Sequence, residues 1–166
     1  MTRLLHLNEK NKIISHHDIA EVWLDTLTNH HSLHAKIPFK PQEVIANFYA
    51  GTTQNTPTYL TVQTEVDTHI TLEPVFLQYI NHSCNPNVFF DTSTMQLISL
   101  SAIEPGDEFG FFYPSTEWQM VQPFNCNCNN LNCLQFITGA AFLNQHILNN
   151  YRLTPFILKM LAQKKH

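Results

Sequence analysis

Four cysteines are the side chains of this sequence with the clearest capacity for chemistry, because thiolates are strong zinc ligands. Cys126, Cys128 and Cys133 form a C-x-C-x4-C pattern, and the remaining cysteine is Cys84. Four thiolates complete one tetrahedral zinc site and leave no position for water, so the metal would be structural. The remote Cys84 would tie the polar segment 124–139 to the rest of the domain. Disulfides or free thiols are the alternatives, but Cys126 and Cys128 are too close for an easy bridge.

A second group of polar side chains lies in the segment 79–87 (YINHSCNPN), between two apolar stretches. On the residues alone this segment is consistent with a turn-rich loop that carries one metal ligand. Asn81 and His82 would then be buried polar groups with hydrogen-bond partners. Tyr113, taken alone, is consistent with a packed tyrosine at the end of a strand.

Length and composition limit what can position these groups. The chain has 166 residues, of which 43% are hydrophobic, 11% aromatic and 13% charged, as expected for one globular domain. The net charge of -4 provides no basic field, so neither nucleic acid nor an anionic membrane is an expected partner. The apolar runs are far shorter than a membrane span, and the first residues do not resemble a secretory signal. We expect the cytoplasm by default, or the nucleus of its own or a host cell.

Hydrophobic periodicity predicts a mostly β domain. The segment 17–28 places apolar residues at helical spacing and predicts one N-terminal helix. The tail 140–161 predicts two short amphipathic helices, separated near Pro155, that pack on the sheets. Short runs of β-branched and aromatic residues predict strands at 44–49, 59–62, 69–72, 88–91, 96–101 and 108–112.

Three stretches in one order resemble a known family. Residues 81–87 (NHSCNPN) resemble the N-H-S-C-x-P-N motif of SET-domain protein lysine methyltransferases. Residues 41–51 are similar to the family's entry strand with its Tyr-x-Gly ending, and 100–113 to the stretch with the active-site tyrosine. The four cysteines match the family's post-SET zinc ligands. The resemblance covers residues 30–139.

This resemblance implies an α+β, mostly β fold of the β-clip type, with short curved sheets and a knot-like active site. It divides the chain into a SET domain (1–123, including the predicted helix), a post-SET zinc-binding segment (124–139) and a helical tail (140–166).

The resemblance also implies a function and a set of site residues. The chain would be an S-adenosylmethionine-dependent protein-lysine N-methyltransferase acting on a protein or peptide, including a histone-like one. Tyr113 would be the catalytic tyrosine, Tyr49 a wall of the lysine channel, and Phe111 the position that influences how many methyl groups are added. A phenylalanine there favours more than one. The implied cofactor contacts are His31, Ser32, Leu33, Asn81, His82, Tyr113 and Phe124.

The chemistry agrees with these residue types. Methyl transfer is an in-line displacement at a sulfonium carbon, so the protein must align a neutral amine with the methyl group. Lysine has an unperturbed pKa of ~10.4, and an apolar channel would lower it by disfavouring the ammonium form. The Tyr113 hydroxyl would orient the amine and stabilise the methyl group during transfer.

The sequence departs from the family at the cofactor loop. Where the family has G-x-G-L-F-A, residues 30–35 read HHSLHA. Both glycine positions, now His30 and Ser32, therefore carry side chains. A side chain would be strained there if the loop requires positive φ. A catalytically silent SET-fold module that binds a peptide is therefore an alternative, as is a small structural zinc protein. His30, His31 and His34 could suggest a metal site, but an exposed histidine-rich loop is favoured because no Asp, Glu or Cys accompanies them.

Overall fold

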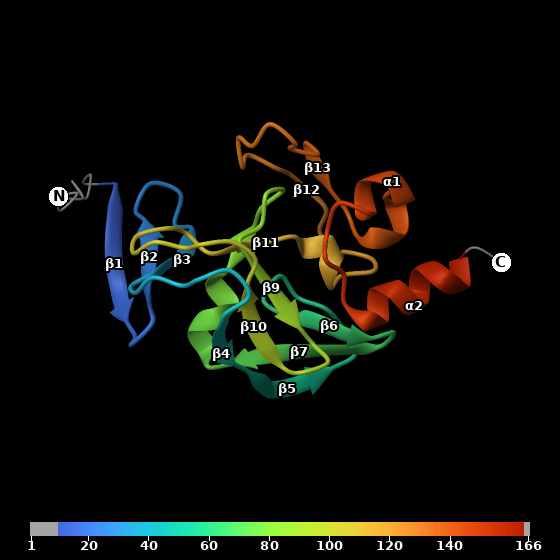
Figure 1. The fold of residues 1–166 in the computed structure, drawn as a ribbon, viewed down its shortest axis with the longest axis horizontal. Coiled ribbons are helices and arrows are strands. Elements are labelled where there is room, and N and C mark those ends of the chain that lie inside the picture. Colours follow the sequence, from blue (N-terminus) through green and yellow to red (C-terminus); the bar gives the residue numbers. More distant parts are fainter. Residues whose placement is uncertain (1–9, 165–166) are drawn as a thin grey trace.

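The computed structural model describes residues 10–164 and consists of small sheets with few helices (Figure 1). This arrangement confirms the predicted mostly β, α+β class. Three antiparallel sheets of three strands carry most of the chain. Their strand orders are β1(Asn11–His16)-β2(Ala20–Asp25)-β3(His31–Ala35), β4(Val44–Asn47)-β10(Gln96–Ser99)-β9(Val88–Asp91) and β5(Tyr49–Gln54)-β7(Thr68–Glu73)-β6(Val62–Glu65).

Two short strand pairs complete the sheets and lie nearest to the motif residues. β8(Asn81–His82) pairs in parallel with β11(Gly110–Phe111), and β12(Phe124–Asn125) pairs antiparallel with β13(Phe136–Ile137). The chain just after β8 passes close to β11, since a Cβ on Gly110 would lie 2.8 Å from the Cβ of Ser83. Glycine is therefore required at position 110.

The helices are short and lie mainly in the C-terminal tail (Figure 1). α1(Gln145–Leu148) and α2(Pro155–Lys164) confirm the two predicted tail helices. Three 3-10 turns, η1(Val75–Tyr79), η2(Tyr113–Ser115) and η3(Ala140–Phe142), link other elements. Among the described residues, none of the helices has the length and apolar character needed to cross a bilayer.

The helix predicted at 17–28 is wrong, because this segment forms strand β2 between β1 and β3. Ala20 and Val22 are buried with a period of two, while Leu27, which the helical pattern used, is 78% exposed. After the strand, Asp25 Oδ1 accepts hydrogen bonds from the amides of Leu27 and Thr28 and closes a turn.

The predicted strands correspond unequally to the observed ones. The run 88–91 is strand β9. The run 69–72 lies within β7, and the run 96–101 contains β10. The run 59–62 is misplaced, because β6 begins only at Val62 after a turn stabilised by Thr61. The alternation of apolar residues was too short there to fix the start of the strand.

Buried apolar side chains form two separate cores. The larger core spans the three-stranded sheets and continues through Phe109 and Phe111. The smaller core joins Phe112 to Leu148 of α1 and to Phe156 and Ile157 of α2. Neighbouring residues 111 and 112 thus face different cores, as alternation along an extended chain requires.

Candidate functional site

The four cysteines meet at one point, although 42 residues separate Cys84 from Cys126. Their Sγ atoms all lie within 4.8 Å of one another, and the Sγ atoms of Cys84 and Cys126 are 4.0 Å apart. In a tetrahedral site with Zn–S bonds of about 2.3 Å, sulfurs lie roughly 3.8 Å apart. The cluster therefore matches a zinc site in both donor type and spacing.

The electrostatics of the cluster also favour a cation. Burial and neighbouring thiolate charges raise the pKa of Cys84 above its usual range, and burial raises the pKa of Cys126 to about 11. Burial opposes ionisation of Cys128 too, but hydrogen bonds from Asn130 lower its pKa to about 6. A divalent cation at the centre would offset the repulsion among thiolates and favour their ionised form.

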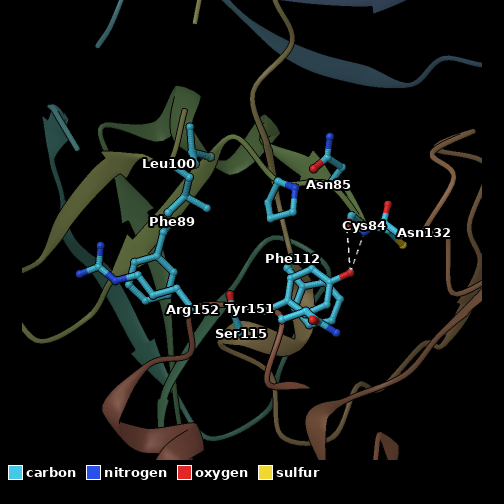
Figure 2. A pocket seen from close by; sticks show the side chains of 12 residues that line it. Cys84, Asn85, Phe89, Leu100, Phe112, Ser115, Asn132, Tyr151 and Arg152 are labelled. Carbon is cyan, nitrogen blue, oxygen red and sulfur yellow. Dashed lines mark hydrogen bonds between the residues drawn. The ribbon is translucent and has the colours of Figure 1, made fainter. Parts of the chain in front are cut away.

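Residues from the tail hold Cys84 in place. The backbone carbonyl of Cys84 accepts hydrogen bonds from the Tyr151 hydroxyl at 2.8 Å and from Asn132 Nδ2 at 2.7 Å. Figure 2 shows the Tyr151 hydroxyl directed at Cys84, and the Tyr151 ring stacks on Phe112 with centroids 3.6 Å apart. The amide of Leu134 donates to Cys84 Sγ at 3.4 Å. The cluster thus connects β8, the segment after β12 and the tail.

A cavity of about 1060 Å³ lies beside the cysteine cluster. It is lined by β8, by β11 with Tyr113 of η2, by residues 57–62, and by residues 120–128 and 130. Its described lining includes the carboxylates of Glu108 and Glu117 but contains no lysine or arginine. Its size suits a nucleoside-sized ligand together with a side chain, and its charge favours a cationic group.

Asn81 and His82 form one wall of this cavity. Asn81 Nδ2 donates to the His31 carbonyl at 2.8 Å and to Glu108 Oε1 at 3.2 Å. The Tyr113 amide donates to His82 Nδ1 at 3.2 Å, so the neutral ring carries its proton on Nε2, which lies 3.2 Å from Cys84 Sγ. Burial lowers the pKa of His82 to about 4 and keeps the ring neutral. His82 therefore connects the cysteine cluster to Tyr113.

Tyr113 lies in the buried part of the cavity. Its ring is 4.7 Å from Phe111 and meets the edges of His82 at 5.3 Å and Phe124 at 5.9 Å. Burial and the charge of Glu117 raise the pKa of Tyr113 above its usual range, so the phenol keeps its proton. No described residue is hydrogen-bonded to its hydroxyl. The hydroxyl is therefore available to a ligand.

Five of the nine predicted catalytic and cofactor residues line this cavity. They are Asn81, His82, Phe111, Tyr113 and Phe124.

The other four predicted residues do not line the cavity. Tyr49 is 64% exposed at the start of β5. Leu33 is fully buried in the larger core, because alternate residues of β3 face that core. The Ser32 hydroxyl is hydrogen-bonded to Nε2 of His34, and the His31 ring stacks on Tyr79 with centroids 4.9 Å apart.

The segment aligned with the family's glycine loop is a strand and not a loop. Residues 31–35 form β3, and the positive φ in this region is that of Asn29, at 59°. Asparagine tolerates this conformation, and His30 and Ser32, at the two glycine positions, do not have positive φ and are not strained. The His34 ring stacks on Trp23 at 4.0 Å, and His30 lines the cavity beside β3.

Sequence reasoning missed Glu117, a buried carboxylate in the cavity wall. Its Oε1 accepts hydrogen bonds from the backbone amide of Gln63 at 2.9 Å and from Thr116 Oγ1 at 3.0 Å. Burial raises the pKa of Glu117 to about 7. The available signal was a lone carboxylate four residues after Tyr113, in an otherwise apolar and hydroxyl-bearing stretch.

Comparison with known proteins identifies one family. A family model described as the SET domain matches residues 4–114, which include the segment 81–87 and Tyr113. Methyltransferase flvH of Aspergillus flavus is 46% identical over 111 residues, covering 65% of this chain and 61% of that protein. The cysteines at 126–133 follow the stretch that the family model matches.

Two further relatives match over shorter parts. A SET and MYND domain-containing protein of Dictyostelium discoideum is 39% identical over 62 residues, covering 30% of this chain and 18% of that protein. A histone-lysine N-methyltransferase of Candida albicans, H3 lysine-36 specific, is 32% identical over 90 residues, covering 47% of this chain and 10% of that protein. The chain matches about 61% of the length of the flvH protein and smaller shares of the other two.

Proposed function

The chain belongs to the SET-domain family, and we propose that it transfers a methyl group from S-adenosylmethionine to a lysine side chain of a protein or peptide. One observation carries this proposal. The Tyr113 hydroxyl has no hydrogen bond from a described residue, and it lies in the same cavity as Asn81 and His82 of the family motif. A phenol without a hydrogen-bond partner, beside a motif that binds cofactor in the family, can hold the amine in position for methyl transfer.

The cavity suits the cofactor by its shape and charge. When bound, S-adenosylmethionine supplies a methyl group on a positively charged sulfur. Glu108 and Glu117 line the cavity without a lysine or arginine among its described residues, so cationic ligands are favoured. We propose cofactor contacts from Asn81, His82, Tyr113 and Phe124, and we do not extend them to His31, Ser32 and Leu33.

The residues around Tyr113 suit a lysine side chain. Phe111 is 7% exposed, and its ring packs on Tyr113 and, at 4.9 Å, on Phe90. This apolar surface disfavours an ammonium group and lowers the pKa of a bound amine. The Tyr113 hydroxyl would hold the amine nitrogen in line with the methyl group. Because Phe111 has no hydroxyl to bond the amine, we propose that more than one methyl group is added.

Zinc would be held by Cys84, Cys126, Cys128 and Cys133, whose sulfurs have suitable spacing. Four thiolates leave no open coordination position, so the metal has a structural role. Cys126 and Cys128 also line the cavity. We therefore propose that zinc fixes the wall that carries Phe124.

Two measurements on one variant test the function. Calorimetry should detect S-adenosylmethionine binding to the wild type and to Tyr113→Phe, since only a hydroxyl is lost. Methylation of lysine-rich peptides with labelled cofactor should fall by about 10²-fold or more in Tyr113→Phe. Tyr79→Phe is the matched control, because Tyr79 lies outside the cavity lining, and it should keep wild-type turnover.

Unchanged turnover in Tyr113→Phe would exclude the assigned role of Tyr113. Absence of cofactor binding at high protein concentration would exclude the enzyme. That result would favour a peptide-binding module of the same fold, for which the missing glycines at 30–35 are the supporting observation.

A further inference from the structure

Glu117 is a buried carboxylate that lacks a cationic partner among the described residues. It is 7% exposed, and none of the ion pairs of the described chain involves it. Its two hydrogen bonds both reach Oε1, from Gln63 and Thr116. Oε2 accepts no hydrogen bond from a described residue. Oε2 is not closed off from the cavity, so water or a ligand can reach it.

Glu117 lies at the proposed lysine site. Glu117 lines the same cavity as Tyr113 and Phe111, and its amide donates to the Tyr113 carbonyl at 3.0 Å. Its charge contributes to raising the pKa of Tyr113, as expected for two groups close together in a buried setting. The carboxylate and the phenol thus belong to one buried end of the cavity.

The proposed reaction needs a proton acceptor at this end. A lysine side chain enters as an ammonium ion, with an unperturbed pKa of ~10.4, and must lose a proton before its nitrogen can accept a methyl group. A carboxylate inside the cavity attracts the cation first and can then take the proton.

Other titratable groups around the cavity are less suited to this task. Glu108 is exposed, and both ring nitrogens of His82 already have partners. Tyr113 retains its proton, His30 and Tyr59 are exposed, and the cysteines belong to the cluster. The hydrogen-bond partners of Glu117 on β6 and at the start of η3 are Gln63 and Ala140, neither of which titrates.

We propose that Glu117 binds the incoming lysine ammonium and accepts one of its protons, so that the amine is neutral when methyl transfer occurs. This inference rests on the proposed function. The N–H bond breaks with its electron pair left on nitrogen, and an O–H bond forms at Oε2 of Glu117. The proton then passes to water through the open part of the cavity. The raised pKa of Glu117, about 7, makes the carboxylate a stronger base than an exposed glutamate and leaves it ionised above neutral pH.

The test is the pH dependence of kcat/KM for peptide methylation in the wild type and in Glu117→Gln. Glutamine keeps the shape and the Oε1 acceptor but cannot take a proton. In the wild type kcat/KM should rise to a plateau above about pH 7. In Glu117→Gln it should fall by about 10²-fold at pH 7 and should rise steadily toward pH ~10, where lysine loses its own proton. S-adenosylmethionine binding should be unchanged.

A matched control and a conservative variant complete the test. Glu65→Gln makes the same chemical change on β6, at a side chain that is 60% exposed and paired with Lys159, and should keep the wild-type profile. Glu117→Asp retains a carboxylate, so its kcat/KM should still rise near pH 7, but to a lower plateau than in the wild type.

Distinct results overturn this inference. A Glu117→Gln profile parallel to that of the wild type would indicate a structural role, and so would a Glu117→Asp profile that rises only toward pH 10. A wild type that neither binds S-adenosylmethionine nor methylates peptide would instead exclude the proposed function, and no variant is needed to see that.

Discussion

The sheet core and the cysteine segment 124–137 form the two sides of the same cavity, yet different forces stabilise them. The sheet core buries large apolar side chains completely, as at Phe90, Leu97 and Phe109. In the cysteine segment Ile137 is the one buried side chain, and Leu131 is fully exposed. Apolar burial can hold the first region but not the second. The side of the cavity carrying Tyr113 is thus built by packing, and the side carrying Phe124 by the thiol cluster.

The largest difference between the two regions should appear when the cluster loses a ligand. Structural zinc sites in small peptides contribute about 10–16 kcal/mol of apparent binding free energy, so loss of one thiolate should release most of the metal. In Cys133→Ser we expect zinc content to fall from about one ion per chain. Segment 124–137 should become sensitive to protease while the β-sheet signal in circular dichroism persists.

Leu131→Ser is the matched control for this change. Leu131 lies in the same segment but is fully exposed and is not a ligand, so zinc content and protease resistance should not change. If Cys133→Ser unfolded the whole domain, the sheet core and segment 124–137 would form one cooperative unit and would not be stabilised separately. A metal-free wild type that resists protease would contradict the zinc assignment itself.

Truncation of a side chain in the sheet core should have the opposite pattern. Phe109 is fully buried, and its ring lies 6.1 Å from that of Phe39. Phe109→Ala should lower the free energy of unfolding by about 3–5 kcal/mol, because it removes apolar contacts and leaves a cavity. Urea unfolding measures this loss, and the folded fraction should retain its zinc. Phe136→Ala, at a side chain that is 51% exposed on β13, should cost far less. Equal losses in both variants would show that segment 124–137 also depends on apolar burial.

The same contrast explains which parts of the site could be predicted from sequence. Cys84, Asn81 and His82 lie within four residues of one another, and metal ligands require particular residue types, so a motif identifies them directly. Tyr49 was predicted as a channel wall, but the register of β5 leaves it exposed. Leu33 lies in the core for a similar reason. Which face of a strand a residue occupies depends on pairing with distant strands, and a short sequence does not contain that information.

Two other differences have the same physical origin. Ile19, Val22 and Trp23 fit helical spacing as well as a strand, and pairing with β1 and β3 decides in favour of the strand. Glu117 is buried because β6 brings the Gln63 amide to it, and 54 residues separate the two. A charged residue near a predicted active site gives no sign of burial until that contact is known.

The smallest expected effect concerns the contact that joins the tail to the cysteine cluster. Tyr151→Phe removes the hydroxyl that donates to the Cys84 carbonyl at 2.8 Å, while the ring can stay stacked on Phe112. Loss of one such hydrogen bond costs about 1 kcal/mol, which corresponds to roughly a fivefold change in an equilibrium. Because Asn132 still bonds the same carbonyl, the cluster should form but should hold zinc about fivefold less tightly in competition with a chelator. The midpoint of urea unfolding of the sheet core should barely move. A large shift of that midpoint with unchanged zinc affinity would mean that Tyr151 stabilises the sheet core and not the cluster, and the division between the two regions would then lie elsewhere in the chain.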